Sequence, residues 1–303
     1  MRPGATMPLM VYGLGAYILW GFFPAFFPLL EPASPLEILA HRIIWTMVVM
    51  GVIIAFTGHW RDIIKANAKT WVWMTGAAIL IAINWGTYVL AVNSGHVAEA
   101  ALGYFINPLM SVALGVLVLR ERLRQVQAIA IGIATAAVTY LTIAQGTPPL
   151  IGLTLAISFA LYGLMKKQVR LSPLASLTME TIILFPVALG YWVFLARTHT
   201  STFSGHGTWH LALLVSAGLV TAVPLLLFNK AAQVLPLATL GIIQFITPNL
   251  QAAWAFFVKH EPSTTADTIT FAAIWFAVVL YLADIVRTDA RRRNAHSDKR
   301  RCQ

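Results

Sequence analysis

Cysteine and charged residues are both scarce in this chain. The single cysteine, Cys302, lies in a polar tail, so neither an intrachain disulfide nor a thiolate metal cluster can form. Only 11% of the 303 residues are charged, against about 25% in an ordinary soluble domain. The glycine-rich phosphate-binding loop of ATP-driven proteins is also missing. These absences argue against a redox protein, a soluble enzyme and a chain that is driven directly by ATP.

Apolar residues dominate what is present, at 58% of the chain. A helix needs about 20 apolar residues to cross a bilayer, and ten such stretches can be counted. The sequence therefore predicts an all-α polytopic membrane protein with ten transmembrane helices. The predicted spans are 8–30, 37–56, 71–93, 97–119, 125–144, 150–169, 175–196, 210–229, 235–258 and 264–286.

Lysines and arginines are distributed very unevenly between the connecting segments. With the amino terminus inside, eighteen of the 21 fall in inside segments, two fall outside, and Arg42 lies within a span. Short loops rich in Lys and Arg face the cytoplasm, so both termini are predicted to be cytoplasmic. The net charge of +10 is then a topology signal and does not indicate nucleic acid binding.

One segment of the chain occurs twice, 138 residues apart. Ser34-Pro35-Leu36, followed by Arg42, returns as Ser172-Pro173-Leu174, followed by Glu180. Further matches keep offsets of 138 to 142 and the same order. They include YILWG with FALYG, Leu102-Gly103 with Leu240-Gly241, and Pro108 with Pro248. Several matches in one order at nearly one offset indicate a duplication.

The duplication predicts two five-helix halves, 1–147 and 148–287, followed by a basic cytoplasmic tail over 288–303. Because five is an odd number, the second half enters the membrane from the opposite side. Inverted halves are the plan of many secondary transporters, whose binding site lies between the halves near the midplane. The connection over 197–209 is polar and rich in small residues, and is predicted to be a flexible loop.

Two charges lie inside predicted spans, Arg42 on the second and Glu180 at the matching place on the seventh. Intramembrane charges are costly and usually mark a substrate or ion path. The two side chains either pair directly or face one cavity from opposite sides. Alternatively, Arg42 has no role in transport and its side chain extends to the lipid headgroups. Glu180 is either a group that takes up a coupling proton or a structural residue.

Amide and aromatic residues inside the spans predict the remaining wall of a polar cavity. Amides are costly in lipid and should face inward, although each could equally hold two helices together. His41 points about 100° away from Arg42 around a helix and is either a cavity residue or a packing residue. The predicted cavity residues besides Arg42 and Glu180 are His41, Trp20, Asn84, Trp85, Tyr88, Tyr104, Asn107, Tyr162 and Gln244.

Four smaller features complete the expectations from sequence. Pro108 and Pro248 are repeat-related prolines inside spans and are predicted to act as hinges. The small residues Ala128, Gly132 and Ala136 form a stripe for close packing against the tenth helix or a second copy of the chain. Glu121 lies among arginines and is predicted to make surface ion pairs. His206 and His210 have no third ligand nearby, so no metal site is expected.

Six strings of the sequence carry a further signal. They are HRIIW (41–45), NWGTYVLAVN (84–93), ALGYFINPLMSVALG (101–115), YGLMKK (162–167), METIILFPVA (179–188) and TAVPLLLF (221–228). Together these strings resemble the RarD-like group within the EamA-type branch of the drug/metabolite transporter superfamily. The resemblance runs from about residue 10 to 286 and implies ten helices in two inverted halves, with helices 5 and 10 often packed together at dimer contacts. It also implies export of metabolites or drugs, and the group's name is associated with chloramphenicol sensitivity.

The residues and the resemblance together predict a transporter of small metabolites or drug-like molecules that works by alternating access in a bacterial plasma membrane. The partners would be a small-molecule substrate and the lipid bilayer, with a homodimer as an open alternative and no cofactor. Two other classes remain: a membrane enzyme acting on a lipid-linked substrate, and a sensor or scaffold that transports nothing. An enzyme would require acid, base or metal-binding residues clustered at one membrane face, and the sequence shows no such cluster.

Overall fold

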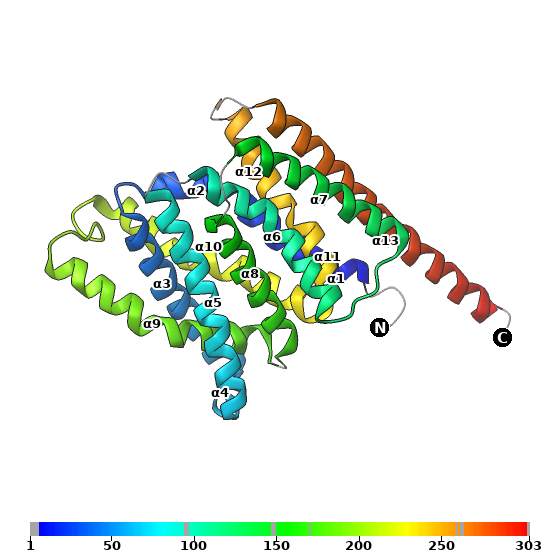
Figure 1. The fold of residues 1–303 in the computed structure, drawn as a ribbon. Coiled ribbons are helices and arrows are strands. Elements are labelled where there is room, and N and C mark those ends of the chain that lie inside the picture. Colours follow the sequence, from blue (N-terminus) through cyan, green and yellow to red (C-terminus); the bar gives the residue numbers. More distant parts are fainter. Residues whose placement is uncertain are drawn as a thin grey trace.

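The computed structural model of the chain describes residues 6–93, 97–146, 150–169, 171–258, 260 and 264–301, and within these its regular structure is entirely helical (Figure 1). Cys302 lies outside the described residues. The helices are α1 (Thr6–Gly21), α2 (Phe23–Phe26), the 3-10 helix η1 (Phe27–Leu30), α3 (Pro35–Thr57), α4 (Trp60–Ile64), α5 (Ala68–Asn93), α6 (Val97–Leu117), α7 (Gln125–Gln145), α8 (Leu150–Gln168), α9 (Pro173–Arg197), α10 (Gly207–Val234), α11 (Leu237–Gln244), α12 (Ile246–Phe257) and α13 (Thr265–Arg301).

Seven segments in the described part of the chain are long and apolar enough to cross a membrane. The other three predicted spans fall on α5, on α6, and on α11 with α12, all of which are helical. The chain is therefore a multi-pass, all-helical membrane protein. The seven segments are Met10–Leu30, Pro35–Thr57, Gln125–Ala144, Leu150–Gln168, Pro173–Arg197, Gly207–Val234 and Thr265–Thr288.

The duplicated Ser-Pro-Leu segment starts two equivalent helices, α3 and α9. In each copy the serine is the N-cap and the proline occupies the first turn, where its missing N–H costs nothing. The hydroxyl of Ser34 accepts a hydrogen bond from Glu37 N at 3.3 Å, and that of Ser172 accepts one from Ala175 N at 3.2 Å. The two helices pack against each other, so the repeat brings Arg42 and Glu180 onto neighbouring helices.

The first predicted span is not one helix, because α1 ends at Gly21 and the chain turns before α2 and η1. Pro24 has no N–H to donate to the carbonyl of Trp20, one turn earlier. That carbonyl instead accepts a hydrogen bond from Gln251 Nε2 of α12 at 3.1 Å. The polar group freed by the proline is therefore satisfied by a helix of the other half, as the membrane interior requires.

The ninth predicted span is also interrupted, since α11 ends at Gln244 and α12 begins at Ile246. Pro248 cannot donate to the carbonyl of Gln244, and Phe245 forms a turn between the two helices. Pro108, its repeat partner, lies within the continuous helix α6. The two prolines are therefore not structurally equivalent: one follows a helix break and the other lies inside a helix.

Helix α7 lies beside α13 along one edge of the molecule (Figure 1). The buried alanines of α7, Ala130, Ala134 and Ala137, face this contact, and the hydroxyl of Thr270 on α13 donates to the carbonyl of Ala137 at 3.4 Å. The predicted stripe of Ala128, Gly132 and Ala136 is exposed and does not make this contact. Helix α13 continues to Arg301, so the backbone of the predicted tail is helical up to that residue.

Glu121 does not make the exposed arginine pairs that its neighbours suggest. Its carboxylate accepts hydrogen bonds from Leu237 N at 2.7 Å and Ala238 N at 2.9 Å, and Lys167 Nζ lies 3.7 Å away. Helix α11 follows Pro236, which provides no side-chain cap. Glu121, in the connection between α6 and α7, therefore supplies the cap that α11 lacks.

Glu121→Ala is expected to destabilise the protein by about 1 kcal/mol, which is the usual cost of removing a helix cap. Glu121→Gln keeps one acceptor oxygen and should lose less. The loss would appear as a lower unfolding midpoint of the purified protein in detergent, followed by circular dichroism. The exposed neighbour Arg122 provides the matched control, Arg122→Ala; equal midpoints for the two alanine variants would contradict the capping role.

Candidate functional site

A cavity of about 680 Å³ lies between helices of both halves of the chain. It reaches the surface at Glu31, an exposed residue between η1 and α3, and we call this the α2 end of the molecule. Eight of the predicted cavity residues line it, and so does the predicted hinge Pro248; their role in binding stays a prediction. The eight are Trp20, Arg42, Asn84, Trp85, Tyr88, Tyr104, Asn107 and Gln244.

Arg42 lies against aromatic rings inside this cavity. Its Nε donates a hydrogen bond to Thr221 Oγ1 of α10 at 2.9 Å. Its guanidinium carbon lies 4.6 Å from the ring centroid of Trp85, 5.4 Å from Phe27 and 5.6 Å from Phe23. Aromatic faces attract cations, so these rings and the threonine hold the guanidinium in place within the body of the protein.

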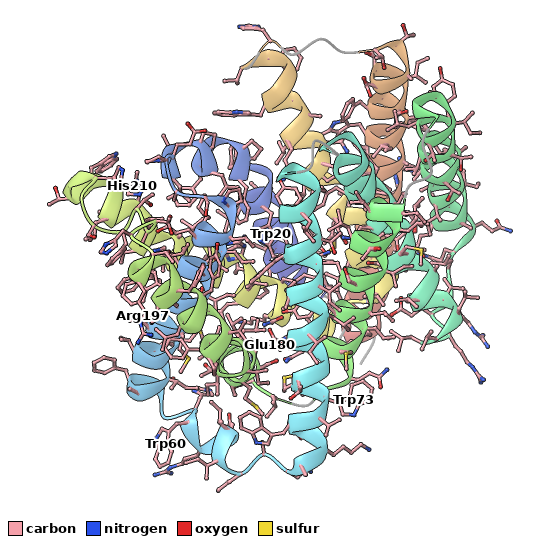
Figure 2. All side chains as sticks on the ribbon, turned by 60° about the vertical axis from the view of Figure 1, so that its left-hand side comes forward. Trp20, Trp60, Trp73, Glu180, Arg197 and His210 are labelled. Carbon is pink, nitrogen blue, oxygen red and sulfur yellow. The ribbon has the colours of Figure 1, made fainter. Side chains whose placement is uncertain are left out.

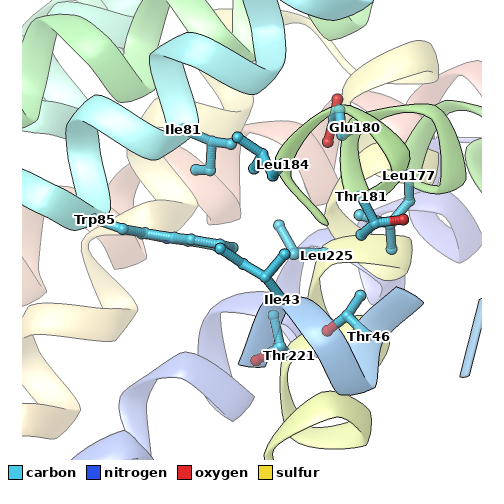
Figure 3. A pocket seen from close by; sticks show the side chains of 10 residues that line it. All are labelled: Ile43, Thr46, Ile81, Trp85, Leu177, Glu180, Thr181, Leu184, Thr221 and Leu225. Atoms are coloured by element: carbon cyan, nitrogen blue, oxygen red, sulfur yellow. The ribbon is translucent and has the colours of Figure 1, made fainter. Parts of the chain in front are cut away.

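Trp85 forms the floor of the cavity, together with Ile81 and Leu225. The same three residues line a second gap of about 10 Å³, whose lining also includes Glu180 and Thr221 (Figure 3). This gap is too small to hold more than about one water molecule. A thin apolar layer around Trp85 thus separates the Arg42 side of the protein from the Glu180 side.

Glu180 pairs with Lys166 of α8, and not with Arg42. The hydroxyl of Tyr162 donates to Glu180 Oε2 at 3.1 Å, and Lys166 also donates to Ser176. Glu180 and Lys166 are 2% and 1% exposed, respectively. The direct Arg42–Glu180 pair, one of the two hypotheses from sequence, is therefore absent from this structure, because each residue has other partners.

The Glu180 cluster lies below the cavity, toward α4. Figure 2 shows Glu180 between Trp20 and Trp60, which belong to α1 and α4. We call this second end of the molecule the α4 end. Neither Glu180 nor Tyr162 lines the large cavity, so both lie one layer away from where the sequence placed them.

Lys166 was missed as a site residue because a lysine at a helix end resembles a topology signal. It lies one turn after Tyr162 on α8, and Glu180 lies one turn after Ser176 on α9. Polar residues four apart share a helix face, so two such pairs on consecutive spans could have indicated that these helices meet through polar groups. Thr221 and the phenylalanines beside Arg42 offered no comparable signal.

His41 does not line the cavity and faces a second polar cluster around Glu37. His41 Nδ1 accepts a hydrogen bond from Trp45 Nε1 at 3.2 Å, and its ring stacks on Phe203 at 4.9 Å. The buried carboxylate of Glu37 accepts from Ser201 Oγ at 2.8 Å, Thr202 N at 2.7 Å and Thr202 Oγ1 at 3.0 Å. The connection over 197–209, which the sequence predicts to be flexible, is thus hydrogen-bonded to the first turn of α3.

The arrangement is a cavity with access from one end and an apolar and ionic closure at the other. It offers one cation, several amides and a wall of aromatic rings, which suits binding more than covalent chemistry. Among the described residues, no three His, Cys, Asp or Glu side chains are grouped so that they could hold a metal ion.

Comparison with known proteins is consistent with this architecture. The model of the EamA-like transporter family matches the chain twice, over residues 7–143 and 147–283. One solved structure has a TM-score of 0.72 at 16% sequence identity, covering 90% of this chain and 97% of the other. At that identity the likeness concerns the fold alone.

Curated bacterial relatives align over nearly their full lengths. Protein RarD of Streptomyces exfoliatus is 44% identical over 94% of this chain and 91% of the relative. The uncharacterized transporter YojE of Bacillus subtilis is 41% identical over 93% and 95%, and protein RarD of Escherichia coli is 37% identical over 93% and 96%. The double match and these identities show that the chain belongs to the EamA-like transporter family.

Proposed function

We propose that the protein exports small metabolites or drug-like molecules across the bacterial plasma membrane by alternating access, without catalysing a reaction. The observation that carries this proposal is the cavity of about 680 Å³ around Arg42. Binding cavities of about 300–1,000 Å³ accommodate drug-sized ligands. The family membership and the relatives that are named transporters support the same class.

The proposed architecture has ten spans in two inverted halves, with α11 and α12 forming one broken span. Its support is the exchange symmetry of the helix contacts. Helix α3 packs on α10 as α9 packs on α5, and α5 packs on α8 as α10 packs on α1. Repeat-related helices also meet each other in the pairs α3 with α9, α6 with α11, and α7 with α13. Such exchange is expected of two copies related by a two-fold axis.

The proposed orientation has both termini in the cytoplasm, and its support is the excess of Lys and Arg at the α4 end, as at Arg61 and Lys65. The cavity would then be open to the outside, and the Glu180–Lys166 cluster would close the cytoplasmic side. Opening inward would require that cluster to separate, with Pro108 and Pro248 as hinges. A homodimer through the exposed face of α7 remains a prediction of the resemblance.

Flux measurements in proteoliposomes test the proposal. Liposomes that hold the purified protein are loaded with a labelled panel of bacterial metabolites and drugs, and release is followed by mass spectrometry. Leu39→Trp places an indole on the cavity wall and should lower flux by about tenfold or more, the equivalent of an overpacking cost of about 1–3 kcal/mol. Val52→Trp on the exposed side of the same helix should not. Absence of release for the whole panel would contradict a transport function.

A further inference from the structure

The cavity carries a cation without a counter-ion. Among the described residues that line it, Arg42 is the only cation and Glu31 the only carboxylate, and no ion pair joins them. Glu31 is exposed at the opening, while Arg42 lies deep among the rings of Trp85, Phe23 and Phe27. A positive charge held in apolar surroundings attracts an anion more strongly than one in water does.

The guanidinium of Arg42 is oriented by its partners but not saturated by them. An arginine has five N–H donors, and only Nε–H, through Thr221, has an acceptor among the described residues. The ring of Trp85 covers the group, with its centroid 4.6 Å from the guanidinium carbon. The terminal nitrogens are then left as a fork, which matches the two oxygens of a carboxylate in a bidentate contact.

The remaining lining decides between classes of anion. A second cation that would balance a dianionic phosphate is absent from the described lining, and the deep part holds no carboxylate for the ammonium group of an amino acid. What it offers is aromatic surface, from Trp20, Tyr88, Tyr104 and Phe159, and neutral amides such as Gln244. These groups fit an apolar or aromatic body with uncharged polar substituents.

We infer that the substrate is an organic monoanion, an aromatic body bearing one carboxylate, with the carboxylate on Arg42 and the ring among the aromatic side chains of the cavity wall. The inference rests on the proposed transport function and adds the chemical class of what is transported.

Four small molecules that differ in charge test the inference on the purified protein. They are 3-phenylpropionate, its neutral amide 3-phenylpropionamide, the zwitterion phenylalanine and the cation 2-phenylethylamine, with binding measured by calorimetry. The acid should bind about ten to a hundred times more tightly than the amide, the range expected for a hydrogen-bonded charge pair. Equal affinities for acid and amide, tighter binding of phenylalanine or the amine, or no binding by any of the four would overturn it.

Variants of Arg42 test whether this residue recognises the negative charge of the ligand. Arg42→Gln should remove the preference for the acid, and Arg42→Lys should retain part of it, because a lysine keeps the charge but not the fork. Arg197→Gln, at the exposed end of α9, is the matched control and should retain the full preference. An unchanged preference in a folded Arg42→Gln protein would overturn the assignment, and the ligand series on the unaltered protein stands even if that variant does not fold.

Counterflow of labelled 3-phenylpropionate in proteoliposomes separates this inference from the proposed function. Binding that depends on Arg42 without counterflow would uphold the ligand class and contradict transport. Counterflow of the amide or of phenylalanine in preference to the acid would uphold transport and overturn the ligand class.

Discussion

Glu180→Leu is expected to destabilise the folded protein by about 3–5 kcal/mol, because it leaves a buried ammonium group without its counter-ion. Lys166 is 1% exposed, and its ion pair with Glu180 joins α8 to α9. Ser176 would remain as a neutral partner but cannot balance the charge. Reversible unfolding in mixed micelles, followed by tryptophan fluorescence, measures the loss.

The double variant Lys166→Met with Glu180→Leu is the informative control. It removes both charges and replaces them with apolar groups, so most of the stability should return, as it does when other buried ion pairs are replaced as a unit. The charge exchange Arg42→Glu with Glu180→Arg should recover no stability relative to the single variants, because these two residues do not pair in the structure. Stability that returns with the Arg42–Glu180 charge exchange, but not with Lys166→Met and Glu180→Leu, would contradict the ion pair between Lys166 and Glu180.

Gly218→Ala is expected to produce the largest packing defect in the helical body, about 1–3 kcal/mol or more. Helix α10 crosses α3 at this glycine, and an added Cβ would lie 2.7 Å from Thr46 N and closer still to the backbone of Trp45. Backbone atoms of a packed helix cannot move aside as a side chain can. The hydrogen bond from Thr46 Oγ1 to the carbonyl of Gly218, now 3.1 Å, would also be disturbed.

Two other helical glycines provide matched controls for this variant. Gly51 on α3 and Gly190 on α9 have no heavy atom within 4 Å of an added Cβ. Alanine at either site should leave the thermal midpoint in detergent unchanged or slightly higher, because alanine favours a helix more than glycine does. If all three alanine variants have the same thermal midpoint, the close crossing of α3 and α10 does not determine stability.

The helices could be predicted from sequence because a bilayer demands about 20 apolar residues per span. The breaks at Phe22 and Phe245 could not, although proline marked both regions. A proline only frees a backbone carbonyl, and whether the helix bends or stops depends on what replaces the lost bond. Gln251 provides that replacement for Trp20, 231 residues away in sequence, and no local pattern contains that information.

The cavity wall was largely predictable, and its ionic closure was not. Arg42 and amides such as Asn84 and Asn107 were recognisable because polar groups are costly in lipid wherever they point. The pairing of Glu180 depends on which helices touch, and Lys166 had a simpler explanation as a cytoplasmic charge. Phenylalanines that flank Arg42 cannot be distinguished in a chain in which 58% of residues are hydrophobic.

The loop after α9 is tied to the helix that carries Arg42. Glu37 holds Ser201 and Thr202 through three hydrogen bonds, and Arg42 follows about one and a half turns later on the same rigid helix. A tilt of α3 that reshapes the cavity must therefore move this loop or break its hydrogen bonds. An antibody fragment selected against residues 198–206 in the present conformation would consequently recognise one state of the protein and slow its exchange with the other.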